Sequence, residues 1–491
     1  MISCIQNSAC VFTGRAGRSR LTASHGLIMF LKNNAPGLNR MRALQWGSIL
    51  FLYVLLPLMP LFLFLQAADP DITLFIRISR TAGIYGFVWY ALQFVVTARN
   101  RIIERFVAQD RRIVLHMLTA VGVLLVVVVH TGFGNEKYAS KLQAGLGGTA
   151  DTIFLWATLF SGLFFSNYFI RFLPVLKPYR DKIAGFLRLT HERCLLLHYV
   201  MPVGMAVLIS HIVFLPGQGL ILFKTCMVMI GCSALSVFLY HKLIVSHKVR
   251  RCPWTVDAVI HESDSVVTVC LNPPPGRNFK HLAGQFCYIR PLDGHIPPES
   301  HPFTISSGPD EKQVCVSVKS SGDFTGRIKD ITPGSRVSMD GPYGKFSYAL
   351  VSPDRHLVFI AGGIGITPML SMLRDLCMKD PKRKVILIWG ARNETDLICL
   401  KEIQAIGKQM EQFVFEPVLS REPCWEGQKG RINRMLMTEI FNRNGMGMAP
   451  SDLMSFDFFI CGPAQMTADM LQLLKQMKVS RDAIHTERFE F

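Results

Sequence analysis

The stretch IVLHMLTAVGVLLVVVVHTGF, residues 113–133, decides the fold class of this chain, because it is long, apolar and interrupted by two histidines. It holds no Asp, Glu, Lys or Arg, and it has about the 20 residues that an α-helix needs to cross a membrane. At a rise of about 1.5 Å per residue, His116 and His130 would lie roughly 20 Å apart along such a helix. The stretch therefore predicts a membrane helix that carries an imidazole at each of two depths.

A second apolar stretch, CLLLHYVMPVGMAVLISHIVFL at residues 194–215, repeats this arrangement with His198 and His211. The paired histidines are fourteen positions apart in the first stretch and thirteen in the second. At roughly 100° per residue, a step of fourteen leaves the side chains about 40° from registry, whereas a step of thirteen misses by about 140°. The second pair therefore requires a distorted helix, and Pro202 lies where it would remove a backbone hydrogen bond.

Two facing histidines at each of two depths match the ligands of six-coordinate haem iron. An unpartnered imidazole is costly in hydrocarbon, and a bis-histidine haem needs one imidazole on each side of the iron. His116 with His198, and His130 with His211, would then hold two haems b along an electron path across the membrane. The alternative is that the histidines form interhelical hydrogen bonds or reach the interface. Four of them at matched depths favour haem.

Four more apolar runs bring the predicted spans to six, at residues 46–65, 81–98, 113–133, 152–170, 194–215 and 220–240. Arginine and lysine concentrate in the loops between spans two and three and between spans four and five, which predicts that these loops are cytoplasmic. Both termini are then cytoplasmic, and the turn at 69–71 and the loop at 134–151 lie outside. Spans three and five run the same way, so His116 faces His198 on the inner side and His130 faces His211 on the outer side.

The net charge of +18 over 491 residues is explained by these cytoplasmic loops and by contact with anionic lipid headgroups, rather than by nucleic acid. Residues 1–45 contain no Asp or Glu, which is typical of a basic cytoplasmic tail; a targeting segment is the alternative. The 13 cysteines show no CxxC pair and no zinc spacing. The sequence therefore predicts neither a disulfide framework nor a structural metal.

After the last span the hydrophobic period changes from that of helices to that of strands. Residues 250–347 contain short alternating runs, such as SVVTVCL and KQVCVSV, separated by Pro and Gly clusters, which predicts an antiparallel β-barrel. From residue 352 to 491, runs such as HLVFIAGG, KVILIWGAR and DFFICGP alternate with helical segments. This order predicts a doubly wound α/β domain with a parallel sheet.

Two segments of the predicted barrel suggest a binding site. HPFTISS, residues 301–307, brings together a Pro-Phe turn and hydroxyl groups that can flank a planar ring and hydrogen-bond one of its nitrogens. Downstream, SGDFTGRI places Thr325 at an expected helix start, where backbone amides can bind a pyrophosphate. Asp323 is expected there as the N-cap.

The predicted α/β domain has three candidate sites at the carboxyl edge of its sheet, where ligands of such folds collect. AGGIGITP, residues 361–368, follows a strand and opens a helix, so its glycines would let a phosphate approach the helix N-terminus. Ser420 and Arg421 end another strand, where they would hold a 2′-phosphate; a charged strand end is the alternative. Cys461 precedes Gly462 and Pro463, and we expect it to be a packing residue close to the nicotinamide rather than a nucleophile.

Together these segments resemble the NADPH oxidase and ferric reductase superfamily over roughly residues 46–491. The resemblance rests on the histidine pairs followed in order by HPFTISS, DGPYG at 340–344, GGIGITP and CGP. It implies a six-helix haem-binding membrane domain at 46–245, an FAD-binding barrel at 250–347 and an NADPH-binding domain at 352–491.

The resemblance also implies roles for individual residues. The contacts to FAD would come from His301, Pro302, Phe303, Thr304, Ser306 and Thr325, and those to NADPH from Gly362, Gly363, Gly365, Thr367, Pro368, Ser420, Arg421, Cys461, Gly462 and Pro463. Phe491 would lie against the flavin. NADPH would then reduce FAD, and single electrons would pass through the inner haem to the outer one.

The final acceptor is O2, giving superoxide, or a ferric chelate. The unequal histidine steps and Arg80, at the outer end of span two, resemble the oxidases, with a snorkelling role for Arg80 as the alternative. Two features differ from the oxidases. Gly134 stands where the oxidases place a further histidine, and the outer loop at 216–219 is short. The sequence favours O2 over the chelate, and a channel or carrier regulated by a flavin domain remains a third interpretation.

Overall fold

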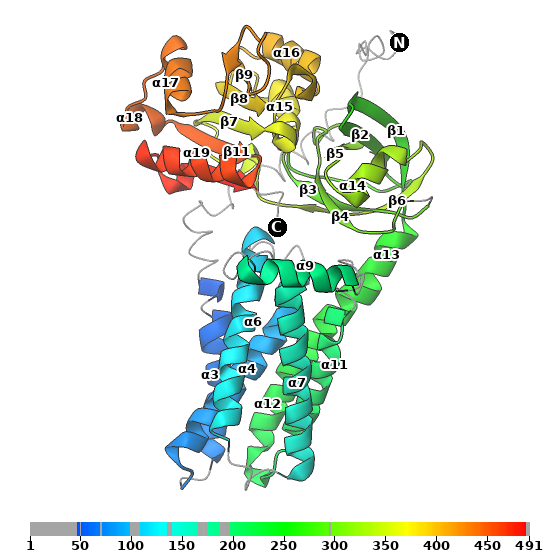
Figure 1. Ribbon diagram of the computed structural model, residues 1–491, viewed down its shortest axis with the longest axis vertical. Helices are drawn as coiled ribbons and strands as arrows, with labels where there is room; N and C mark the ends of the chain where they lie inside the picture. Colours follow the sequence, from blue (N-terminus) through cyan, green and yellow to red (C-terminus); the bar gives the residue numbers. More distant parts are fainter. Residues whose placement is uncertain are drawn as a thin grey trace, which may run out of the picture.

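The computed structural model describes residues 47–49, 51–68, 71–98, 109–134, 140–164, 170, 174–186, 194, 197–293 and 296–487. A bundle of long helices carries two β-sheet domains at one end (Figure 1). The basic tail predicted for residues 1–45 and Phe491 lie outside the described residues.

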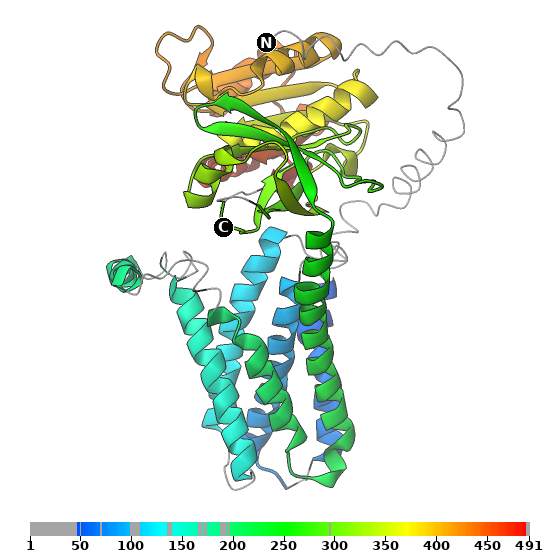
Figure 2. The same ribbon diagram turned by 90° about the vertical axis from the view of Figure 1, so that its right-hand side faces the viewer.

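The bundle is built from helices that lie side by side in both views (Figures 1 and 2). They are η2 and α3 (Phe51–Leu55 and Leu56–Ala67), α4 (Leu74–Thr97), α6 (Gln109–Gly132), α7 (Lys141–Phe164), α11 (Met201–Val213) and α12 (Ile221–Leu239). Val88 and Met205 are fully buried between them. The outward face of α6 is apolar instead, since Leu118, Leu125 and Val128 are each about two-thirds exposed.

Three helices of the described part of the chain are long and apolar enough to cross a membrane: Gly47–Ala67, Arg112–Gly132 and Ile221–Arg251. The apolar helix Met201–Val213 is shorter. α4 and α7 are long but more polar, because α4 includes Arg77 and Arg80 and α7 includes Lys141 and Asp151. Length and composition thus support three of the predicted spans by themselves.

The predicted loop at 134–151 is wrong over much of its length, because α7 begins at Lys141. Ser140 accepts a hydrogen bond from the backbone N–H of Gln143 (3.2 Å), as an N-cap does. Within the helix, the hydroxyl of Thr149 donates to the carbonyl of Gly145 (2.8 Å). Capping and internal bonding of these polar side chains let the helix start well before the uniformly apolar segment.

The distortion expected near Pro202 takes the form of a helix start. Tyr199 and Val200 form a turn after His198, and α11 begins at Met201 with Pro202 in its first turn. A proline at this position removes no helical hydrogen bond. The hydroxyl of Tyr90 donates to the carbonyl of Met201 (2.8 Å) and so ties the turn to α4.

The last helix of the bundle leads directly into the first β-domain (Figure 1). α12 continues through η6 (Tyr240–Val245) and α13 (Ser246–Arg251), and β1 begins at Trp254. The predicted end of the membrane domain at residue 245 therefore falls within a continuous helical segment. Through this segment, the bundle carries the β-domain directly.

The first β-domain is the predicted antiparallel barrel. Its strands are β1 (Trp254–Ser263), β2 (Val266–Asn272), β3 (Phe286–Pro291), β4 (His301–Thr304), β5 (Val314–Lys319) and β6 (Arg336–Tyr343). They are ordered β4-β3-β6-β1-β2-β5. A bridge between Ile305, just after β4, and Val316 on β5 joins the two ends of this order and closes the sheet.

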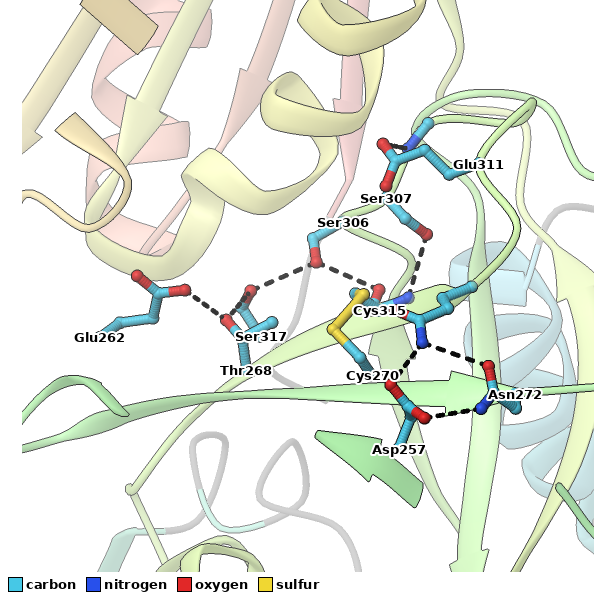
Figure 3. Close-up of a disulfide and its surroundings, with 12 residues drawn as sticks. Asp257, Glu262, Thr268, Cys270, Asn272, Ser306, Ser307, Glu311, Cys315 and Ser317 are labelled. Atoms are coloured by element: carbon cyan, nitrogen blue, oxygen red, sulfur yellow. Dashed lines mark hydrogen bonds between the residues drawn. A yellow bond between two sulfur atoms is a disulfide. The ribbon is translucent and has the colours of Figure 1, made fainter. Parts of the chain in front are cut away.

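A disulfide between Cys270 and Cys315 corrects the sequence analysis, which predicted no disulfide framework. The two cysteines lie directly opposite each other on the antiparallel strands β2 and β5 (Figure 3). Ser306 and Ser307 hydrogen-bond the backbone of Cys315. The disulfide thus adjoins the segment that follows β4.

The second β-domain is the predicted parallel α/β fold. Its strands are β7 (His356–Gly362), β8 (Val385–Ala391), β9 (Phe413–Leu419), β10 (Gln428–Lys429), β11 (Phe456–Cys461) and β12 (Ile484–Glu487), in the order β10-β9-β8-β7-β11-β12. One core unites α15 (Thr367–Lys379) and α16 (Leu400–Gln409) with one face of the sheet. The opposite face packs against α17 (Arg434–Arg443), α18 (Pro450–Leu453) and α19 (Ala464–Gln476).

Candidate functional site

A cavity of about 1320 Å³ lies where the barrel meets the carboxyl edge of the parallel sheet. Of the predicted site residues, the cavity is lined by His301, Pro302, Phe303, Thr304, Thr325, Gly362, Gly363, Gly365, Thr367, Ser420, Arg421, Gly462 and Pro463. The fold therefore brings together residues that are spread over 163 positions of the chain, from 301 to 463. Ser306, Pro368 and Cys461 are not part of the lining.

The barrel side of the cavity presents Thr304 at the end of β4. Thr304 is buried, and its hydroxyl oxygen has no hydrogen-bond partner among the described residues. An unsatisfied buried hydroxyl on the wall of a large cavity is a natural partner for a heteroatom of a bound ring. Next to it, His301 stacks on Phe324 (ring centroids 4.0 Å apart) and pairs with the carboxylate of Glu299 (2.9 Å).

Thr325 lines the cavity, but its hydroxyl is engaged in the start of the short helix α14 (Asp323–Arg327). The hydroxyl oxygen accepts hydrogen bonds from the backbone N–H groups of Ser321 and Gly322, both at 2.9 Å. The N-cap is Gly322, so the expectation that Asp323 is the N-cap is wrong. Thr325 can contribute to a phosphate site by fixing the conformation of this loop. To bond the phosphate directly, its hydroxyl would have to give up one of these hydrogen bonds.

Two glycine segments of the parallel sheet pack against each other rather than only lining a phosphate site. A Cβ at Gly365 would lie 2.2 Å from the carbonyl oxygen of Cys461, and one at Gly462 would lie 3.0 Å from Cα of Gly362. Gly363 differs, because its φ of +52° requires glycine and its Cβ position faces open space. Gly363 is therefore the glycine best suited to a close approach by a ligand.

Three arginines line the cavity where β8, β9 and β10 end. Arg421 lines it together with Arg392, which follows β8, and Arg431, which follows β10. The sequence analysis identified Arg421 but missed the other two, because only the strand order places their loops beside it. Three guanidinium groups at one end of the cavity form a natural site for a doubly charged phosphate.

Three of the residues predicted for this site, Ser306, Pro368 and Cys461, do not line the cavity. Ser306 donates to the carbonyl of Cys315 (3.1 Å), and Pro368 occupies the first turn of α15. Cys461 is fully buried, and burial raises the pKa of its thiol well above the usual value. A protonated, enclosed thiol is a packing group, as expected, although it does not reach the cavity surface.

Helix α15 ties the two β-domains together. The Arg374 guanidinium donates to the carbonyl of Ser306 (2.7 Å) across the domain boundary and forms two bonds with the Glu402 carboxylate (2.6 and 2.7 Å). The hydroxyl of Ser371 donates to the carbonyl of Ser307 (2.7 Å). The helix that starts beside Gly363 is thus fixed to the segment that follows Thr304.

The bundle brings the two inner histidines together, with their ring planes at 80° to each other. The ring centroids of His116 and His198 are 6.1 Å apart. Two imidazoles that ligate one metal ion from opposite sides through bonds of about 2 Å have their centroids about 6 Å apart. The Nδ1 of His198 donates to the hydroxyl oxygen of Ser161 (2.8 Å), because that hydroxyl gives its own hydrogen to the carbonyl of Ala157 (2.6 Å).

The outer histidines are oriented by backbone carbonyls. Nδ1 of His130 bonds the carbonyl of Ser79 (2.9 Å), and Nδ1 of His211 bonds the carbonyl of Gln143 (2.8 Å). A carbonyl oxygen only accepts, so Nδ1 carries the hydrogen and Nε2 keeps the lone pair of the neutral ring. Metal-ligating histidines show this arrangement.

Glycines lie against both outer rings. A Cβ at Gly83 would lie 2.8 Å from Nδ1 of His130, and one at Gly147 would lie 2.9 Å from Nδ1 of His211. The residues fit a bis-histidine haem in three respects: the inner ring centroids have a suitable separation, Nδ1 is hydrogen-bonded in His130, His198 and His211, and glycines leave room beside the two outer rings.

Arg80 lies at the level of the outer histidines. It follows Ser79, whose carbonyl holds His130, and its guanidinium lies over the ring of Phe64, 5.6 Å from the centroid. Arg80 is half-buried. Arg80 is thus next in sequence to a residue that holds an outer histidine, and its role at the acceptor site stays a prediction.

Comparisons with known families identify the half of the chain beyond the bundle. Residues 253–347 match the family described as "FAD-binding domain", and residues 359–472 match "Oxidoreductase NAD-binding domain". Together with the two sheets, these matches show a ferredoxin-reductase-type module that binds FAD and NAD(P). The cavity between the barrel and the parallel sheet lies within this module.

Several curated proteins are similar to this module. A component of the Na(+)-translocating NADH-quinone reductase of Idiomarina loihiensis is 31% identical over 34% of this chain and 40% of its own length. Cytochrome b5 reductase 4 of Mus musculus is 28% identical over 44% and 42%. The reductase component of propane 2-monooxygenase of Rhodococcus jostii is 29% identical over 46% and 60%. The chain thus spans 40 to 60% of the length of these relatives.

Solved structures give similar matches. The CS-b5R domains of human Ncb5or in the NAD+ form are 25% identical, with a TM-score of 0.42, over 48% of this chain and 68% of that one. Flavohemoglobin from Malassezia yamatoensis is 16% identical, with a TM-score of 0.45, over 72% of this chain and 100% of that one. Neither likeness adds to the assignment that the family matches give.

Proposed function

We propose that this protein transfers electrons from cytoplasmic NADPH, with FAD and two haems b as its carriers, to an acceptor on the opposite side of the membrane. The acceptor is O2, and the product is superoxide. The observation that carries the proposal is the union, in one chain, of an FAD and NAD(P) module with a bundle that pairs two histidines at 6.1 Å between ring centroids and holds two more by backbone carbonyls.

The two nucleotide-binding surfaces of the module face the same cavity. FAD supplies the step that changes electron pairs into single electrons, and it would bind on the barrel side, where the unsatisfied hydroxyl of Thr304 would hydrogen-bond the flavin. NADPH would bind on the sheet side, with its pyrophosphate beside Gly363 and Thr367 and its 2′-phosphate beside Ser420 and Arg421. Arg374 and Ser371 would hold the two surfaces in register by bonding the residues after β4.

The bundle would place the haems one above the other. His116 and His198 would ligate the inner iron, and His130 and His211 the outer iron. Haem held in this way would supply one-electron transfer, and its iron would have no free position for the acceptor, which would be reduced without binding to the metal. The apolar outer face of α6 suits a lipid environment, and the three long apolar helices support three of the six proposed spans.

Arg80 supports O2 as the acceptor. Arg80 follows Ser79, whose carbonyl orients His130, and a positive charge near the outer histidines would stabilise the negative charge that develops on O2 as it is reduced. The environment of Phe64 keeps part of the arginine away from water and so strengthens this effect.

Ferric-chelate reduction is the second candidate, and the exposed outer end of the bundle favours it. α11 ends at Val213, and α12 begins at Ile221 after the short turn η5 (Gln218–Leu220), so this connection is too short to form a cap. An uncovered haem edge would admit a bulky chelate as readily as O2.

The first test is NADPH-driven reduction of cytochrome c by the purified protein loaded with FAD and haem, with and without superoxide dismutase. A Soret band with two haems per chain, and inhibition by dismutase, are the expected results. Dismutase-insensitive reduction of Fe(III) chelates would move the assignment to a ferric reductase. Absence of the Soret band would instead support a channel or carrier regulated by a flavin domain.

A further inference from the structure

Arg112 is a buried cation at one end of the bundle. It lies in the first turn of α6 and is 6% exposed. Its Nη1 donates to the backbone carbonyl of Ala98 at a long 3.3 Å, and its buried Nε has no hydrogen-bond partner among the residues that the structure describes. No carboxylate of the described part of the chain pairs with it. A guanidinium in this position is unfavourable unless an anion completes its surroundings.

The position of Arg112 relates it to the inner histidine pair. Arg112 and His116 are four residues apart on α6, so they lie on the same face of the helix, one turn apart. The buried Nδ1 of His116 also has no hydrogen-bond partner among the described residues. The turn of α6 that faces the inner site thus carries two unsatisfied polar groups.

A third unsatisfied group comes from the neighbouring helix. α4 and α6 run antiparallel, since Ala98 lies opposite Arg112 and Gly83 lies opposite His130. This register puts Gln93 at about the level of His116. Gln93 is 6% exposed, and within the described part of the chain neither its amide oxygen nor its amide nitrogen has a hydrogen-bond partner. Three such groups within about one helical turn of the inner histidines indicate a polar ligand inside the bundle.

We propose that Arg112 binds a carboxylate of the cofactor held by His116 and His198, namely a propionate of the inner haem. This inference rests on the proposed function. The ligand must be planar and largely apolar to fit between the helices, yet carry an anion one helical turn from the iron. Haem b has both properties. The phosphate of a lipid headgroup is the other source of an anion at the end of a membrane helix, and the test separates the two.

The test compares the wild-type protein with R112M, which has a side chain of similar length without the charge, and with R112K, which keeps the charge. The midpoint potential of each haem is measured by optical redox titration, and haem loss is measured by transfer to apomyoglobin. Because a nearby cation favours the reduced haem, R112M should shift one haem to a more negative potential and leave the other unchanged. Haem loss from that site should be roughly tenfold faster in R112M than in the wild type. R112K should have a midpoint potential and a rate of haem loss close to those of the wild type.

Arg77→Met is the control, because Arg77 is an exposed arginine at the start of α4, far from Ala98 along that helix, and donates to the carbonyl of Ile72 (3.3 Å). Both of its potentials should match those of the wild type. Equal potentials and equal haem loss in R112M and wild type would overturn the proposal, and loss of copurified phospholipid from R112M alone would assign the site to a headgroup. If R112M elutes as an aggregate, the test uses R112K and the wild type alone, and the midpoint potentials of their haems are compared in the same way. A wild-type protein without a Soret band would overturn the proposed function and this inference together.

Discussion

Individual glycines decide whether the outer histidines can keep their orientation. Gly147 and Gly148 are neighbours on α7, and they differ in one respect that matters here. A Cβ at Gly147 would lie 2.9 Å from Nδ1 of His211, whereas a Cβ at Gly148 would meet nothing within 4 Å. The two positions therefore form a matched pair for testing the role of His211.

Gly147→Ala should weaken or abolish the outer haem. The new methyl group would push the His211 ring from the carbonyl of Gln143, and overpacking of this kind costs about 1–3 kcal/mol. Haem content by the pyridine haemochrome assay should fall from two toward one per chain. Gly148→Ala gains the same helix propensity and should keep both haems. Equal haem content in the two variants would contradict the assignment of His211 as a ligand.

Arg421→Ala should raise KM for NADPH roughly tenfold and leave KM for NADH nearly unchanged, because a charge-assisted hydrogen bond to a phosphate contributes about 1.5–3 kcal/mol. Steady-state reduction of ferricyanide with each nucleotide measures this difference. Arg434→Ala, which removes an arginine of α17 outside the main cavity, is the control and should change neither value. An equal rise in KM for NADPH and NADH would show that Arg421 does not bind the 2′-phosphate.

The outcome for single residues shows what sequence patterns can and cannot predict. HPFTISS and GGIGITP are each an unbroken motif, so the sequence was enough to single out Thr304 and Gly363. Both residues line the cavity. Arg392 and Arg431 were missed because they join Arg421 only through the order of β8, β9 and β10. Cys461 is fully buried and is not part of the cavity lining, and its expected place near the nicotinamide stays a prediction.

At the scale of elements, α15 is the link between the two nucleotide surfaces. Its N-terminus follows Gly363, and its third turn carries Arg374, which bonds the carbonyl of Ser306 and the carboxylate of Glu402. Burial alone would lower the pKa of Arg374, but its hydrogen bonds with Glu402 outweigh this effect and raise the pKa. The guanidinium therefore stays charged, and the link does not depend on pH in the physiological range.

Arg374→Ala should slow reduction of the flavin by NADPH more than it weakens NADPH binding. Loss of the link would let the two domains shift, and small misplacements of reacting atoms reduce rates strongly, about 10²-fold for 1 Å. Stopped-flow absorbance at saturating NADPH measures the rate, and Arg374→Lys should recover part of it. Lys382→Ala removes an exposed lysine that only approaches Glu411 (3.9 Å), and it should have no effect. A raised KM with an unchanged rate would contradict a positioning role.

Elements were predictable where hydrophobic periodicity is strong. The parallel order of β7, β8, β9 and β11 and the antiparallel barrel followed from runs of apolar residues bounded by Gly and Pro. The start of α7 at Lys141 did not, since polar side chains that bond within the helix look like loop residues. The Cys270–Cys315 disulfide was also hidden, because the two residues are 45 positions apart and only the register of β2 and β5 makes them neighbours.

At the scale of the whole molecule, the module is joined to one end of the bundle, which would give electrons a path from the module into the bundle. The helical segment from Ile221 to Arg251 continues directly toward β1, which holds the barrel at the end of the bundle (Figure 2). At about 1.5 Å per residue, this segment is roughly 45 Å long, longer than the hydrocarbon core of a bilayer. The module would therefore stand clear of the membrane on the side of Arg112 and the inner histidines.

This arrangement predicts that NADPH and the final acceptor are used on opposite sides of a sealed membrane. The protein, loaded with FAD and haem, is reconstituted into lipid vesicles that contain trapped cytochrome c, and NADPH is added outside. Chains whose module faces outward should reduce the trapped cytochrome c, because the carriers in the bundle connect the two compartments. His130→Leu should abolish this reduction while NADPH still reduces the flavin, since the outer haem is lost and the module is unaltered. Reduction only of cytochrome c added to the outside, on the same side as NADPH, would show that electrons leave from the module itself and that the bundle does not conduct them.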